Sequence, residues 1–216
     1  MQINGIVNEY IHVEKPDQEA VPSRQFDISK IDFDLLSREF AHTRRKNLLL
    51  RDLDELVNQQ LAKMLFANPQ RIDYYDRYQE IIDAYNAEQN RATIEKTFMD
   101  LMELASSLDT EQQRYVREGF SSDEELSVYD LLFSENLTKQ EIETIKKVSV
   151  DLLTKIKQQI AKLDHWTDKQ ETKAIVDNLI RKTLWQELPN SYDVSDIQTY
   201  QKKIYEYVYM RYPEVA

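Results

Sequence analysis

The stretch TKQEIETIKKVSVDLLTKIKQQIAKL, residues 138–163, decides the fold class of this chain. Thr138 and Glu141 have the spacing of a capping box, in which each side chain accepts a hydrogen bond from the other residue's backbone at the start of a helix. Aliphatic residues then recur every three or four positions, at Ile142, Ile145, Val148, Leu152, Ile156, Ile160 and Leu163. This spacing places them on one face of a helix. We therefore predict a long amphipathic helix that ends near residue 163.

Helix signals of the same kind occur along most of the chain. N-terminal caps are predicted at Ser29–Asp32, Asn68–Pro69, Thr110–Gln113, Ser122–Glu125 and Ser195–Gln198. Gly119 and Pro189 are typical of residues that follow or end a helix. With the apolar periodicity, these signals predict helices over about 31–43, 47–66, 69–88, 91–107, 110–119, 122 onward, 138–163, 165–187 and 195–211. The expected fold is all-α, with about nine helices in an irregular helical bundle.

The composition agrees with a helical protein and excludes some chemistry. Among 216 residues there are only two glycines, whereas sheets with tight turns need more. Neither G-x-x-x-x-G-K-[ST] nor G-x-G-x-x-G occurs, so the familiar loops that bind ATP or dinucleotides are absent. Because there is no cysteine, thiol catalysis, disulfides and thiolate metal sites are excluded.

Charge and hydropathy indicate the surroundings of the chain. The formal net charge of −11 disfavours nonspecific binding to nucleic acid, which needs clustered Lys and Arg to neutralise phosphates. No apolar run approaches the roughly 20 residues that span a bilayer. Residues 1–16 lack the pattern of a signal peptide. We expect a soluble, cytoplasmic protein without membrane contact.

Three regions differ in their patterns. Residues 1–25 combine Pro, Ser and charge without helical periodicity, and predict a poorly structured or extended N-terminal arm or linker. Residues 26–120 and 121–216 carry the helix signals. We interpret them as the first and second helical parts of one continuous helical domain.

Residue types that bind metals or cleave DNA are present but are not grouped. His12, His42 and His165 are far apart and have no cysteine partner, so they predict no metal site. Pro16-Asp17 and Glu171–Lys173 match the letters of a PD…E-x-K nuclease centre, which binds Mg²⁺. Such centres lie on a sheet, whereas Glu171–Lys173 is expected within a helix. We therefore predict no catalytic, cofactor-binding or metal-binding residue in this chain.

Two stretches are candidates for contact with a partner. Arg44, Arg45 and Lys46 form the densest basic patch, which is typical either of a solvated helix junction or of contact with nucleic acid or an acidic protein. Trp166 and Trp185 fall near opposite ends of the predicted helix 165–187, at similar azimuth. Tryptophans so placed either fasten the helix to its neighbours or bind a partner.

The last predicted helix is rich in tyrosine. Its tyrosines are Tyr200, Tyr205, Tyr207, Tyr209 and Tyr212. At 100° per residue they cannot all face one core, so some are expected to pack inward and others to lie outward. Tyr205 and Tyr209 join the candidate interface residues.

Several distinctive strings occur in order from about residue 26 to residue 212: FDISKIDFDLL (26–36), RRKNLLLRDL (44–53), NPQRIDYYDRYQEIIDAYN (68–86), EELSVYDLL (124–132), Leu163-Asp164 with Trp166, and LPNSY (188–192) before the last predicted helix. Together they resemble the C-terminal helical region of the R subunit of type I restriction enzymes. The string 68–86 is the most specific, because helix amphipathicity alone does not require it.

The resemblance implies that the parent subunit translocates and cleaves DNA, using ATP and Mg²⁺ in domains that are absent here. It would be a type I site-specific deoxyribonuclease that works with methyltransferase and specificity subunits. The helical region is associated with assembly onto that core, so this chain alone is expected not to be catalytic. The alternative is a DNA-backbone contact element of the same translocase, which would touch DNA indirectly or weakly through residues 44–46.

Overall fold

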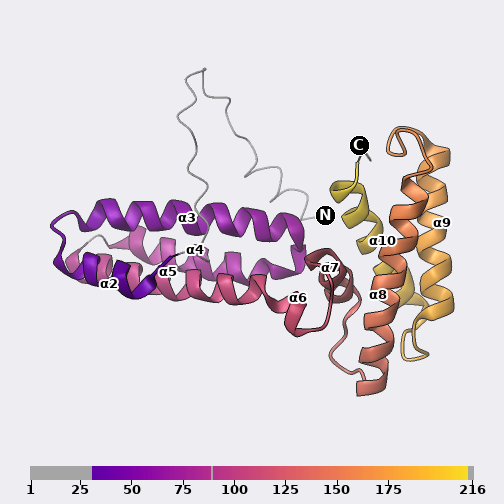
Figure 1. Cartoon of the computed structure of the whole chain (residues 1–216), viewed down its shortest axis with the longest axis horizontal. Coiled ribbons are helices and arrows are strands. Elements are labelled where there is room, and N and C mark those ends of the chain that lie inside the picture. Colours follow the sequence, from indigo (N-terminus) through magenta and orange to yellow (C-terminus); the bar gives the residue numbers. More distant parts are fainter. Residues whose placement is uncertain (1–30, 89, 214–216) are drawn as a thin grey trace.

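The computed structural model describes residues 31–88 and 90–213. Within that range there are nine α-helices and one 3₁₀ turn, and no strand, as Figure 1 shows. The elements are α2 (Phe33–His42), α3 (Lys46–Ala67), the 3₁₀ turn η2 (Pro69–Arg71), α4 (Ile72–Ala87), α5 (Arg91–Gln112), α6 (Arg114–Arg117), α7 (Asp123–Leu132), α8 (Lys139–Ile160), α9 (Gln170–Glu187) and α10 (Val194–Arg211). The prediction of an all-α fold is confirmed. The predicted N-terminal arm lies outside the described residues.

The helices α2 to α5 form the first helical group. Both α3 and α4 pack along α5, and the three run side by side in Figure 1. Their shared core contains Val57, Leu61, Leu101 and Leu104, all buried. The short helix α2 is attached by Phe40, whose ring stacks on that of Phe98 with 3.6 Å between centroids.

The helices α7 to α10 form the second helical group. The predicted apolar face of residues 138–163 is its centre, because the five members of the stripe from 145 to 160 are all buried. Ile142 and Leu163, at the two ends of the stripe, pack against this core from its edge.

The two groups have separate apolar cores that meet around α7. In the view of Figure 1 the long helices of the first group run horizontally, α8 and α9 run nearly vertically beside them, and α7 lies where the groups meet. The first core ends at Leu108 and the second begins at Phe120. The division of the chain into domains stays a prediction. None of the helices over 31–88 and 90–213 is long and apolar enough to cross a bilayer.

Three of the predicted helix boundaries are confirmed in atomic detail. Thr138 and Glu141 form the reciprocal capping box that begins α8. The Asn68 side chain accepts a hydrogen bond from the backbone N–H of Gln70, with Pro69 at the first position of η2. Gly119 has φ of 84° and follows α6, as a left-handed cap does.

Several predicted boundaries are wrong by a few residues. Asp32, expected at the third position of a capping box, is itself the N-cap of α2, and its side chain accepts from the Leu35 backbone N–H. Thr110 does not begin a helix, because α5 continues to Gln112 and the Thr110 hydroxyl donates back to the Ser106 carbonyl. Such short cap signals also occur inside helices, where the longer apolar repeat decides.

The predicted N-cap of α7 at Ser122 is confirmed without the reciprocal bond of a box, whereas the cap of α10 is shifted. Ser122 does accept from the Glu125 N–H, but the Glu125 carboxylate accepts from the N–H of Ser121 instead of completing the box. In α10 the box is formed by Asp193 and Asp196, two residues before the predicted start at Ser195. The helix begins after Asp193 and not at Ser195, because Asp193 is a strong N-cap residue whose spacing to Asp196 fits a capping box.

The prediction that Trp166 and Trp185 share one helix is wrong. Residues 161–169 form turns, and α9 begins only at Gln170. His165 has φ of 44°, a left-handed conformation that cannot continue a right-handed helix. Trp166 therefore lies in the connection before α9, and Trp185 lies near the end of α9.

Candidate functional site: a charged junction between the two helical groups

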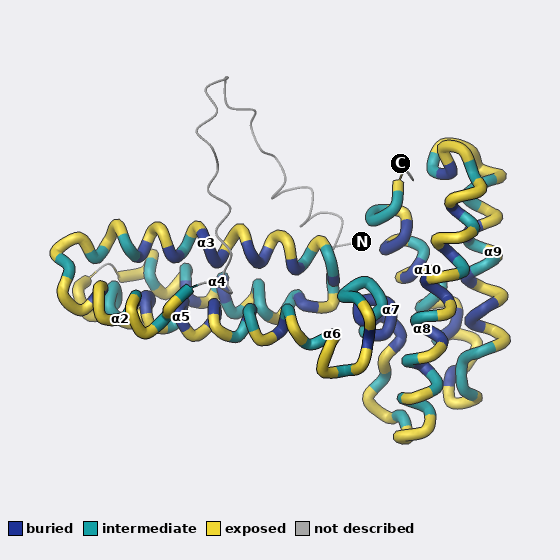
Figure 2. The backbone as a smooth tube through the Cα atoms, in the orientation of Figure 1, coloured by how far each residue is buried: buried dark blue, intermediate teal, exposed yellow. Residues whose placement is uncertain are grey.

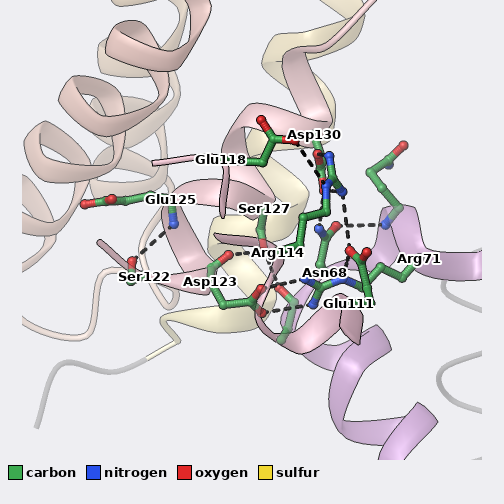
Figure 3. A network of polar contacts seen from close by, with 12 residues as sticks. Asn68, Arg71, Glu111, Arg114, Glu118, Ser122, Asp123, Glu125, Ser127 and Asp130 are labelled. Carbon is green, nitrogen blue, oxygen red and sulfur yellow. Dashed lines mark hydrogen bonds and ion pairs between the residues drawn. The ribbon is translucent and has the colours of Figure 1, made fainter. Parts of the chain in front are cut away.

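Arg71 is the centre of a polar network where the two groups meet, shown in Figure 3. Its side chain is only 4% exposed. The guanidinium donates through Nε to Glu111 Oε1 at 3.0 Å, and through Nη1 and Nη2 to the two carboxylate oxygens of Asp123 at 3.0 and 2.6 Å. Asp123 is the first residue of α7. Arg71 thus ties the end of η2 to both α5 and α7.

Arg114 makes a second bidentate contact beside the first. Its Nη1 and Nη2 donate to Asp130 of α7 at 3.0 and 2.8 Å, and Nη1 also lies 3.4 Å from Glu111. The Asn68 side-chain amide donates to Asp130 at 2.7 Å. Ser127 donates to the Ala67 carbonyl at 2.9 Å, which joins α7 to the end of α3. We call Asn68, Arg71, Glu111, Arg114, Asp123, Ser127 and Asp130 the junction network.

Burial and pairing act in opposite directions on the ionisable groups of this network. Burial raises the pKa of Asp130 above its ordinary value, although Arg114 and Asn68 act to lower it. Burial would lower the pKa of Arg71, but the hydrogen bonds and charges of Asp123 and Glu111 outweigh it and raise the pKa. Arg71 therefore stays cationic at any working pH.

This arrangement supports a structural role, in which paired charges join the first helical group to α7. Arginine does not act as a base, and the carboxylates already accept hydrogen bonds from arginines or an amide. A buried ion pair of this kind resists separation, because removing one partner leaves the other as an uncompensated buried charge. The junction network therefore fixes how the first helical group sits against α7.

A second fastening is made by the end of α10. Trp166, 1% exposed, donates from Nε1 to the Tyr212 carbonyl at 2.6 Å, and its ring meets those of Tyr205 and Tyr209 edge-on. Arg211 lies over the Phe66 ring of α3, 4.8 Å from its centroid. The last turn of α10 thus reaches the first helical group as well.

Glu124, on α7, links this helix to α8 and to the last turn of α10. It forms ion pairs with Lys157 and, at 3.8 Å, with Arg211. Burial alone would raise the pKa of Glu124, but the hydrogen bond and charge of Lys157 lower it below the ordinary value. Glu124 is therefore ionised at neutral pH and holds both cations.

The candidate interface residues of the second group differ in exposure. Trp185 is 53% exposed on α9, in contrast to buried Trp166. Tyr209 is partly exposed, with Lys173 Nζ 5.7 Å from its ring centroid, and Tyr205 is half-buried beside Trp166. Tyr207 is buried, so the prediction that tyrosines of this helix face both inward and outward is confirmed.

The basic patch lies at the other end of the molecule. Arg44 and Arg45 are exposed in the turn between α2 and α3. Lys46 is instead bound to Glu95 at 2.6 Å and lies 4.9 Å from the Phe40 ring centroid. Since Figure 1 places this turn and α9 at opposite ends, the structure does not bring the patch and the tryptophans together. Their role as interface residues stays a prediction.

The residues tested as metal or nuclease ligands are scattered too. His42 ends α2, and His165 lies exposed in the connection before α9. Glu171 and Lys173 are in the first turn of α9, without a strand nearby in the described chain. Among residues 31–88 and 90–213, no group of three or more His, Cys, Asp or Glu side chains could hold a metal ion. His12 and Pro16-Asp17 lie outside the described residues.

Reasoning from the sequence did not find the junction network. Its signal is the string NPQRIDYY, whose Asn68 and Arg71 have no amphipathic reason to be there. The partners of Arg71 are 40 and 52 residues away, at Glu111 and Asp123, so the pairing could not be deduced from spacing. Strings 68–86 and 124–132, which carry the family resemblance, supply four of the seven residues of this network.

Comparison with known proteins supports the same relationship. No curated protein and no solved structure matches the chain. One family model matches residues 18–212, and it describes the C-terminal part of endonuclease subunits like that of the type I restriction enzyme HindI. This match covers most of the 216 residues. The chain belongs to the family of type I restriction enzyme HindI endonuclease subunit-like C-terminal domains.

Proposed function

We propose that this chain is a non-catalytic docking module, which holds the endonuclease subunit of a type I restriction enzyme on its methyltransferase and specificity subunits. The observation that carries the proposal is the position of Arg71, which belongs to the string 68–86, the most specific part of the family resemblance. Arg71 is buried and paired with carboxylates of α5 and α7, so it joins the two helical groups instead of lining an open pocket. Side chains that hold a rigid shape suit an assembly role.

The catalytic work of the parent subunit belongs, in this proposal, to other domains. ATP and Mg²⁺ would bind there, since the chain has no phosphate-binding loop motif. What this module adds is a fixed geometry, because the junction network and the contact of Arg211 with Phe66 set one helical group against the other. Partners that bind surfaces on both groups are then held in a defined relation.

The proposal is tested by mixing the purified chain with the cognate methyltransferase–specificity complex and measuring mass by light scattering after gel filtration. A co-eluting complex is expected. An excess of the chain should also slow DNA cleavage by the assembled enzyme, because it competes with the endonuclease subunit. If the chain neither co-elutes nor competes, while the intact endonuclease subunit binds, docking is wrong.

One observation favours a second function, contact with the DNA backbone. Arg44 and Arg45 project from the α2–α3 turn, and no described carboxylate pairs with either. Two free guanidinium groups can contact phosphates, although the net charge of −11 opposes this. Duplex binding measured over a salt series, for the chain and for Arg44→Glu/Arg45→Glu, separates the two functions. Binding at low salt that the double variant loses would support this function.

A further inference from the structure

The outer face of α9 is exposed and is not packed against the core of the second helical group. It consists of Ile175, Asn178, Arg181, Lys182 and Trp185, all exposed. At 100° per residue these five lie within about one third of the helix circumference and extend about 15 Å along it. Figure 2 shows α9 at the edge of the second group, with exposed positions along its outer side.

The opposite face of α9 holds the residues of this helix that are buried in the core. Val176, Ile180, Thr183 and Leu184 are buried in the second core. Trp185 is therefore not needed to attach α9, and it leaves more than half of its surface in water. A large aromatic side chain so placed is common at the centre of protein interfaces, where tryptophan and arginine contribute most of the binding free energy.

The charge of this face differs from that of the chain as a whole. Arg181 and Lys182 precede Trp185 by one helical turn and so flank it. The Arg181 guanidinium bonds only the Asn178 side-chain oxygen, at 2.9 Å, and neither cation has a carboxylate partner within the described residues. By contrast, Arg71 and Arg114 are both fully paired. Two unpaired cations beside an exposed tryptophan, in a chain of net charge −11, indicate an acidic partner.

We infer that the outer face of α9 is the docking surface for a protein partner that offers an apolar pocket to Trp185 and carboxylates to Arg181 and Lys182. This inference rests on the proposed function and specifies which face performs it. Duplex DNA fits less well, because it needs many cations and has no pocket for an indole in its backbone. A second copy of α9 fits less well too, since Glu171 is the only carboxylate among its exposed residues.

The test compares variants of the full 216-residue chain for binding to the cognate methyltransferase–specificity complex, free of DNA, at 50 and 500 mM NaCl. Trp185→Ala should weaken binding by about 30-fold at both salt concentrations, as loss of an interface anchor does. Arg181→Glu/Lys182→Glu should weaken it about tenfold at low salt, and by much less at high salt where charges are screened. Thermal unfolding checks that each variant keeps its fold.

Two matched controls are available in the first helical group. Met99→Ala removes an apolar side chain as exposed as Trp185, and Lys63→Glu/Lys96→Glu reverses two exposed cations outside the basic patch. Both should bind like the unmodified chain. If they weaken binding as much as the α9 variants do, the assignment of the face is wrong.

The possible outcomes separate the inference from the proposed function. If the unmodified chain binds and the α9 variants bind equally well, docking stands and the outer face of α9 is not the surface. If the unmodified chain does not bind, both are wrong. If the chain instead dimerises through Trp185, or binds duplex DNA through Arg181 and Lys182 but not the complex, the inference of an acidic protein partner is overturned.

Discussion

Arg71 and Asp123 face one another through two hydrogen bonds of 3.0 and 2.6 Å, although 52 residues separate them in the chain. One ends the 3₁₀ turn of the first helical group and the other begins α7. The planar fork of arginine matches a carboxylate at two points, so the pair fixes orientation as well as distance. The relation between the two groups therefore depends on this contact more than on the apolar packing within either one.

Arg71→Ala should destabilise the chain strongly. It leaves Asp123 without its cation and Glu111 with only Arg114 at 3.4 Å, and the loss of a buried partner typically costs about 3–5 kcal/mol in the free energy of unfolding. Arg77→Ala is the control, because its ion pair with Glu103 is exposed and contributes roughly 0–1 kcal/mol. Urea unfolding followed by circular dichroism measures both. Equal effects of the two substitutions would contradict the role of the junction network.

Gly119→Ala should cost roughly 1–2 kcal/mol, the usual penalty for an L-residue in the left-handed region. Gly119 has φ of 84°, and a Cβ placed there would meet no atom within 4 Å. The loss is therefore conformational and not steric. Gly119→Asn should lose less, since asparagine tolerates this conformation better than alanine. Thermal melts of the two variants decide, and a larger loss for asparagine would contradict this reasoning.

Substitution of the two tryptophans should change the free energy of unfolding by very different amounts. Trp166→Ala empties a buried site and removes the donor to the Tyr212 carbonyl, for an expected cost of about 3–5 kcal/mol. Trp185→Ala should change the free energy of unfolding by no more than about 0.5 kcal/mol, because the side chain is at the surface. Chemical denaturation of the two variants provides the comparison. A large loss for Trp185 would mean that α9 depends on its outer face.

The pKa of Asp130 should lie above the ordinary value of an aspartate, because burial disfavours its charged form. Since the folded-state pKa is raised, its contribution to stability is greatest below the unfolded value and declines as pH rises through the folded value. Arg114→Gln should raise the pKa of Asp130 further, by removing the cation that acts to lower it. Carboxyl-carbon NMR titration of both proteins measures the shift. A lower pKa in the variant would reverse the assigned cause.

The sequence was sufficient to predict those helices that have one apolar face and a local capping signal. The stripe of α8 and the cap at Thr138 are local features, and the structure has both. The start of α9 was missed because the left-handed turn at His165 depends on where Trp166 is held, and its partner Tyr212 is 46 residues away. The junction network was missed for the same reason. Pairing between distant charges leaves no periodic trace in a sequence.

The contact of Arg211 with Phe66 has a mechanical consequence. The contact brings the last turn of α10 back to the end of α3. Along the chain, these two points are separated by every element from η2 to α9. Tension applied at residue 213 would therefore reach α3 and α7 directly, without first unravelling α8 and α9. Such a short load path would keep the two helical groups together while the chain bears tension.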